Sequence, residues 1–171
     1  NDIHERFNIH RTFFSDDFTY MLRGLHRIYS RHRSLDAFAA ANGASKSDCP
    51  AWQFAEALSR ELAKANDGAR NPRCLPTDFG KTALKRINMA LRWLVRRDGI
   101  VDLGVWESIT PAQLYIPLDV HVGNTARALC LLDRKSNDRI AVVRLTELLR
   151  TLRPGDPANY DFAQHCAEQQ P

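Results

Sequence analysis

The residues best suited to chemistry in this sequence are a lysine, Lys85, and an aspartate, Asp119, which lie 119 − 85 = 34 positions apart. Lys85 is flanked by Leu84 and Ile87, at the border of an apolar helix face. A lysine there can bury its alkyl chain and keep its ammonium in water, which is a purely structural role. If it points instead into a cleft, desolvation and neighbouring cations favour the neutral amine, and a neutral amine is a nucleophile.

Asp119 lies in the segment 115–123, with the sequence YIPLDVHVG. An extended apolar stretch ends at Pro117, and apolar residues then recur at helical spacing, so a helix is expected to begin near Asp119. Its carboxylate can cap the free amides of the first turn. It can also stand at the mouth of a cleft and stabilise positive charge. A partner elsewhere in the chain decides between the two roles.

Helices must position both residues, because the chain has no strong alternating strand pattern, repeat or low-complexity segment. We expect an all-α single domain with about six or seven helices. The longest helix is predicted to open at Thr77 or Asp78 and to contain Lys85. Ser15 and Ser34 are predicted N-caps, and Ser136 or Asn137 is predicted to cap a later helix. The predicted helices cover residues 18–31, 35–41, 50–65, 77–97 and 120–132. A further helix is predicted from the cap at Ser136 or Asn137 to about residue 152, and a short helix is predicted to begin at residue 110.

Basic residues recur on the predicted helices. Lys81, Lys85, Arg92 and Arg96 fall roughly on one side of the longest helix, and arginines recur every fourth residue from Arg23 to Arg31. Such faces are usually solvated, and contact with phosphates is the alternative. The three tryptophans, Trp52, Trp93 and Trp106, fit core packing better than base stacking.

Composition restricts the classes of protein. The 171 residues carry a net charge of +4 and a pI near 9.0, which permits an anionic partner without requiring one. No apolar run is long enough to span a bilayer, so no membrane association is expected. The four cysteines are far apart and form no metal-binding motif, which fits free thiols in a cytoplasmic protein. Because the chain begins at Asn1, we expect it to be a fragment of a longer protein.

Three segments resemble the bacterial family of unknown function DUF2400. They are KRINMALRWLVR at 85–96, PLDVHVGN at 117–124 and YDFA at 160–163. The resemblance covers residues 12–162. Members of that family are longer at the N-terminus, so the resemblance implies that this chain lacks their first helices.

The segment 117–122 is also similar to that around the catalytic aspartate of the helix-hairpin-helix DNA glycosylase superfamily. The wide separation of lysine and aspartate is closest to the archaeal 8-oxoguanine DNA glycosylases. This similarity implies a helical bundle with a cleft, base-excision and AP lyase activity on damaged double-stranded DNA, and no metal or cofactor. Lys85 and Asp119 would be catalytic. The implied DNA contacts are Arg86, Arg92, Arg96, His121 and Asn124.

Two features depart from these families. No Gly-x-Gly hairpin precedes Lys85, and Gly80 in Phe79-Gly80-Lys81 is the nearest substitute. The C-terminal residues 164–168 lack the apolar ending expected of DUF2400. A non-catalytic DNA-binding module and a helical interaction domain therefore remain alternative hypotheses. An amine at Lys85 that meets the carboxylate of Asp119 in a cleft would favour the enzyme.

Overall fold

Helix α3 lies at the centre of the larger group of helices, and both α1 and α4 pack against it in the computed structural model. The apolar side of α3 is buried over its whole length, from Trp52 to Leu62. At the crossing with α1, Gly24 lies against Leu62, where an added Cβ would be only 1.9 Å from Leu62 Cδ2. Close approach of these two helices therefore depends on a glycine.

Most of the described residues, 7–98 and 100–160, are helical. Within these ranges the structure has six α-helices, which are α1 (Ser15–Tyr29), α2 (Leu35–Ala41), α3 (Pro50–Lys64), α4 (Lys85–Val95), α5 (Val120–Ala128) and α6 (Arg139–Leu152). Three short 3-10 helices are η1 (Ala44–Lys46), η2 (Pro111–Gln113) and η3 (Pro157–Asn159). None of the helices in this part of the chain is long and apolar enough to cross a membrane.

The largely helical architecture is as predicted, but a small antiparallel hairpin was not expected. Strands β1 (Asn8–His10) and β2 (Phe13–Phe14) pair just before α1, with Arg11 in the turn at a positive φ of 51°. Strands of three and two residues are too short to show an alternating pattern in the sequence. The hairpin also displaces the predicted N-cap, since Phe14 caps α1 and Ser15 is its first residue.

The other predicted helix ends agree closely with the structure, except at the start of α4 and at the end of α5, which lies at Ala128 instead of near residue 132. Ser34 caps α2, where its hydroxyl accepts a hydrogen bond from the Ala37 amide at 3.0 Å. The cap of α6 is Asp138, one residue beyond the predicted Asn137. Helix α4 begins only at Lys85 and has 11 residues, so the prediction of a helix from Thr77 or Asp78 was wrong.

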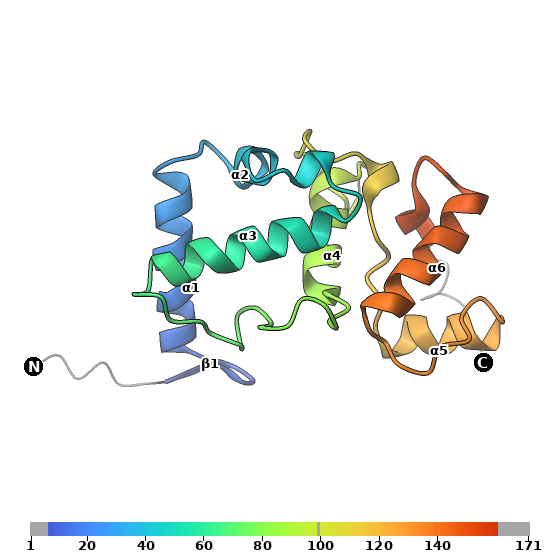
Figure 1. Cartoon of the computed structure of the whole chain (residues 1–171), viewed down its shortest axis with the longest axis horizontal. Coiled ribbons are helices and arrows are strands. Elements are labelled where there is room, and N and C mark those ends of the chain that lie inside the picture. The colour runs from blue at the N-terminus through green and yellow to red at the C-terminus, as the bar shows by residue number, and fades with distance from the viewer. Residues whose placement is uncertain (1–6, 99, 161–171) are drawn as a thin grey trace, which may run out of the picture.

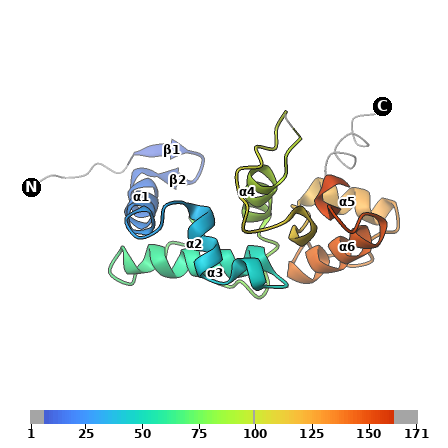
Figure 2. The same ribbon diagram turned by 90° about the horizontal axis from the view of Figure 1, so that it is seen from above.

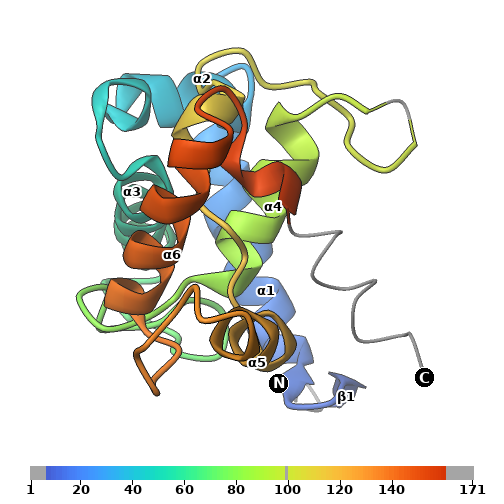
Figure 3. The same cartoon turned by 90° about the vertical axis from the view of Figure 1, so that its right-hand side faces the viewer.

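The helices form two groups that meet at α4 (Figure 1). Helices α1, α2 and α3 lie on one side, α5 and α6 on the other, and α4 stands between them in both Figure 1 and Figure 2. Seen from the end in Figure 3, α5 and α6 are nearest to the viewer and α4 lies behind them. A buried aromatic contact joins α3 to the segment that leads into α5, because Trp52 meets Tyr115 edge to face at 5.2 Å. The start of α4 faces the start of α5, since Lys85 and Asp119 are in contact there.

Candidate active site

The amine of Lys85 meets the carboxylate of Asp119, with 2.9 Å between Nζ and Oδ2. The lysine side chain is 47% exposed and the aspartate side chain is 14% exposed. The pair therefore joins a solvent-accessible amine to a largely covered acid. The two residues come from the first turn of α4 and the N-cap of α5, so the N-termini of two helices converge on this contact.

Two hydrogen bonds fix Asp119 in addition to its contact with Lys85. Its Oδ1 accepts a hydrogen bond from the Val122 amide at 2.9 Å, which is the predicted N-cap. The side-chain amide of Asn137 donates to the Asp119 carbonyl at 2.7 Å. A Cβ at Gly123 would lie 2.5 Å from Asn137 Oδ1, so the glycine leaves space for that contact. The segment 117–123 therefore holds its acid in one position.

The surroundings of Asp119 keep it ionised. Burial alone raises the pKa of a carboxyl group, because it disfavours the charge. The hydrogen bonds from Lys85 and from the Val122 amide, together with the positive charge of Lys85, outweigh burial and lower the pKa of Asp119 below its ordinary value. Near neutral pH this side chain is an anion.

Lys85 is positioned by the irregular segment just before it. Leu84 adopts the left-handed conformation, with φ of 50°, which costs of order 1–3 kcal/mol in a residue other than glycine. Three neighbours hold the carbonyls ahead of it. Trp52 Nε1 donates to Thr82 at 3.2 Å, Asn88 Nδ2 donates to Ala83 at 3.0 Å, and the Arg139 amide donates to Lys81 at 3.1 Å. These bonds stop the helix from extending back to residue 77.

A shallow pocket of about 260 Å³ opens beside Lys85. Its walls come from the segment 72–76 and from the start of α4, and they include Arg73, Thr82 and Arg86. Two of the lining side chains besides Lys85 are cationic, so the pocket suits an anionic group. Lys85 stands between this pocket and Asp119.

The predicted DNA-binding residues divide into two sets. Arg86, His121 and Asn124 are exposed, near the start of α4 or in α5. Arg92 and Arg96 are only 3% and 7% exposed.

The two buried arginines belong to an internal ion-pair cluster. Arg96 hydrogen-bonds to Asp102, Asp156 and Asn159, and Arg92 NH2 lies 3.6 Å from Asp102 Oδ2. Their placement argues against phosphate contacts by Arg92 and Arg96. They instead tie α4 to the 96–106 loop and to η3.

Several residues that shape the site were not singled out from the sequence. Asn88 holds the backbone just before Lys85 through a bond to a residue five positions away, and Asn137 holds the backbone of Asp119 from 18 positions away. The glycine of PLDVHVGN is the one sequence signal that could have indicated the contact with Asn137. Trp52 and Trp106 are buried as expected, whereas Trp93 is 44% exposed on α4. The end of the YDFA segment, Cys166 and residues 164–168 lie outside the described residues.

A family model described as a protein of unknown function, DUF2400, matches residues 1–169, and the chain belongs to this family. No curated protein and no solved structure matches the chain. Neither search therefore links it to the DNA glycosylases that its 117–122 segment resembles.

Proposed function

We propose that this DUF2400 protein is a DNA base-excision glycosylase with AP lyase activity, in a helical glycosylase-like fold, and that it acts on an oxidised purine such as 8-oxoguanine. The observation that carries the proposal is the 2.9 Å contact between the Lys85 amine and the Asp119 carboxylate. In Schiff-base chemistry on a sugar, the amine of a lysine serves as the nucleophile. The carboxylate of an aspartate stabilises the positive charge that develops on the sugar.

The chemistry begins with the damaged nucleotide extruded from the duplex. The Lys85 ammonium passes one proton, through the Asp119 carboxylate, to the base that will leave. The amine nitrogen then bonds to C1′ of the sugar. The glycosidic bond breaks, and the base departs with the electron pair and the transferred proton. The Asp119 carboxylate, again an anion, lies beside the positive charge that develops on the sugar.

Strand cleavage follows from the covalent intermediate. The sugar ring opens, O4′ takes one of the two protons that remain on nitrogen, and a protonated Schiff base forms between Lys85 and C1′. Water takes a proton from C2′, the C3′–O bond breaks, and the 3′ phosphate leaves with the electron pair of that bond. Water then hydrolyses the imine and restores the Lys85 amine. Each step uses only the side chains of the pair, the DNA and water.

The electrostatics of the site support an anionic substrate. The N-terminus of a helix carries a partial positive charge, and two such ends converge here. Lys85 and the exposed Arg86 add two full positive charges in the first turn of α4, where cations do not stabilise the helix itself. An arrangement that costs the helix stability is consistent with a binding role for these cations.

Borohydride trapping tests the proposal, because it reduces a Schiff base to a stable amine. The substrates are a duplex with 8-oxoguanine and a duplex with one abasic site. We expect a covalent protein–DNA product with the wild type and none with Lys85→Gln. Lys81→Gln is the matched control, since Lys81 is four residues away and 90% exposed. It should trap DNA like the wild type.

The outcomes separate the hypotheses. Trapping that persists unchanged in Lys85→Gln would exclude Lys85 as the nucleophile. Salt-dependent DNA binding without trapping by the wild type would instead support the non-catalytic DNA-binding module. Absence of both would leave a helical interaction domain.

A further inference from the structure

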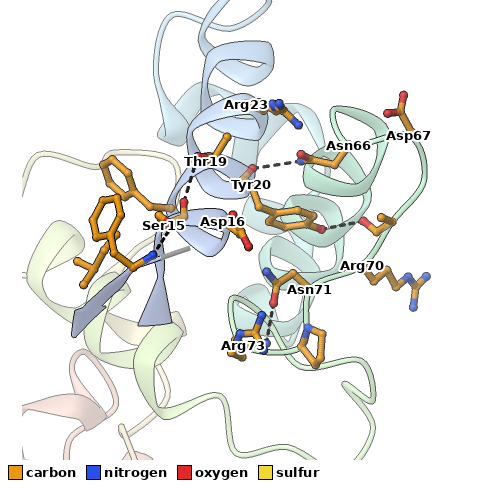
Figure 4. Close-up of a pocket in the computed structure, with 15 residues that line it drawn as sticks. Ser15, Asp16, Thr19, Tyr20, Arg23, Asn66, Asp67, Arg70, Asn71 and Arg73 are labelled. Atoms are coloured by element: carbon orange, nitrogen blue, oxygen red, sulfur yellow. Dashed lines mark hydrogen bonds between the residues drawn. The ribbon is translucent and has the colours of Figure 1, made fainter. Parts of the chain in front are cut away.

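A second and larger pocket, of about 710 Å³, lies on the far side of the segment that borders the Lys85 pocket. It is formed by β1, by α1 and by the loop 66–73 (Figure 4). Pro72 and Arg73 line both pockets, so the two pockets share a wall. Its volume falls within the range of ordinary ligand sites.

Hydrogen bonds hold the walls of this pocket in place. Asp17, which is fully buried, accepts two bonds from Arg73 Nε at 2.9 Å and one from Asn71 at 2.6 Å. The Tyr20 hydroxyl donates to the Ala69 carbonyl at 3.1 Å, and Figure 4 shows this bond between α1 and the loop. Asn66 Nδ2 donates to the Tyr20 carbonyl at 3.1 Å, so the loop 66–73 is bound to α1 at both ends.

The lining combines three kinds of group. Phe7 and Phe18 present apolar rings that are 61% and 49% exposed. Arg23 from α1 and Arg70 from the facing loop project at the rim (Figure 4), and within the described residues neither forms an ion pair. Asp16 and Asp67 contribute exposed carboxylates.

This mixture favours one class of ligand. Two arginines suit phosphates, exposed aromatic rings suit the faces of bases, and a carboxylate accepts hydrogen bonds from the N–H groups of a base. An inorganic phosphate would use only the arginines and would be repelled by the carboxylates. Bases are accessible to such a lining only when they are not paired in a duplex.

We propose that this pocket binds unpaired nucleotides of the DNA strand that leads to Lys85, an inference that rests on the proposed function. The shared Pro72–Arg73 wall sets the path of the strand from one pocket to the other. Arg23 and Arg70 contact its phosphates, and Phe18 stacks on a base. The substrate class is then a lesion next to a single-stranded segment.

Binding of fluorescent oligonucleotides tests this inference without requiring catalysis. The probes are a single-stranded thymidine oligonucleotide and an oligomer of abasic spacers with the same number of phosphates. All measurements use the Lys85→Gln background, so that no covalent product forms. Arg60→Ala is the control, because Arg60 is exposed on α3 and lines neither pocket.

The two variants should differ in which of the two probes they bind more weakly. Arg23→Ala combined with Arg70→Ala should weaken both probes about tenfold and lower the slope of log affinity against log salt by about 1.4, at ~0.7 per phosphate. Phe18→Ala should weaken the thymidine probe at least about fivefold and leave the spacer oligomer unchanged. All three side chains are exposed, and thermal unfolding checks that the variants remain folded.

Two results would overturn the inference. One is equal binding of the thymidine probe by the double arginine variant and by Arg60→Ala. The other is equal loss of both probes in Phe18→Ala. Failure of the proposed function would look different, since the Lys85→Gln protein would then bind the probes normally and the wild type would form no borohydride adduct with any substrate.

Discussion

Replacement of Asp119 by asparagine separates the two roles of this side chain. In the structure Oδ1 caps α5 through the Val122 amide, and Oδ2 contacts the Lys85 amine, each at 2.9 Å. Asparagine caps helices about as well as aspartate, so Asp119→Asn keeps the cap and removes the charge. Asp119→Ala removes both.

The expected losses in stability are small and unequal. The Lys85 side chain is 47% exposed, so solvent screening limits the ion pair to about 0.5 kcal/mol. Loss of the cap adds about 1 kcal/mol. For a domain of this size, 1 kcal/mol corresponds to roughly 2–4 °C in Tm. We therefore expect Tm to fall by about 1–2 °C in Asp119→Asn and about 3–6 °C in Asp119→Ala.

The pH dependence follows from the lowered pKa of Asp119. A carboxyl group whose pKa is lower in the folded state stabilises that state above its unfolded pKa, which is near 3.8. This stabilisation is lost as the pH falls through the folded pKa. The difference in free energy of unfolding between wild type and Asp119→Asn, measured in urea, should thus be constant near neutral pH and shrink in acid.

Activity is the second measurement on the same variants. If Asp119 stabilises positive charge on the sugar, Asp119→Asn should lower the rate of borohydride trapping by about 100-fold, far more than its effect on stability. Equal destabilisation by the asparagine and alanine variants would refute the division into cap and charge. A fully active Asp119→Asn would remove the carboxylate from the chemistry.

Three further predictions concern packing, buried charge and thiols. Asp102→Ala leaves the buried guanidinium groups of Arg92 and Arg96 without their shared acid and should cost about 3–5 kcal/mol in urea unfolding, so a loss below about 1 kcal/mol would contradict the assigned ion pairs. Gly24→Ala places a methyl group against Leu62 and should cost about 1–3 kcal/mol, whereas Gly155→Ala, with no atom within 4 Å, should be nearly neutral in the same thermal melts. Burial raises the pKa of Cys74 to about 11, so at about pH 8 its thiol should react with Ellman's reagent more slowly than the thiol of the exposed Cys130. Serine variants assign each rate to its cysteine, and equal rates for the two thiols would contradict this prediction.

Local signals in the sequence were enough to predict most of the helices. Ser34 and Asp119 are short polar residues directly before apolar periodicity, and both cap helices as predicted. Pro50 similarly marks the first turn of α3. Ser34 and Asp119 bind free amides of the first helical turn, and the fixed φ of Pro50 fits the geometry of that turn. The residues that decide where these helices begin therefore lie within a few positions of one another in the sequence.

The start of α4 could not be predicted in this way. Phe79 and Leu84 continue the apolar spacing of the helix back to residue 77, and both are at least partly buried. The carbonyls of this segment are nevertheless bound by Trp52 from α3 and by the Arg139 amide from α6. These donors are about 30 and 60 residues away in the chain, where periodicity carries no information about them.

The same limit explains the two arginines that the sequence assigned to DNA. Arg92 and Arg96 lie seven and eleven residues after Lys85, on roughly the same side of α4. One side of a helix can pass from solvent at its first turn to the core at its third. Here Asp102, in the loop just after α4, and Asp156, 60 residues beyond Arg96, neutralise the charge that the sequence assigned to phosphates.

The late start of α4 is also what makes the candidate site geometrically possible. Had the helix begun at residue 77, Lys85 would lie about 12 Å along its axis, inside the third turn and away from the helix end. Leu84 instead turns the backbone through the left-handed region, and Lys85 becomes the first residue of the helix. Only from that end does its amine meet the cap of α5. The strain at Leu84, held by Asn88 and Trp52, is therefore the local feature on which the contact between amine and acid depends.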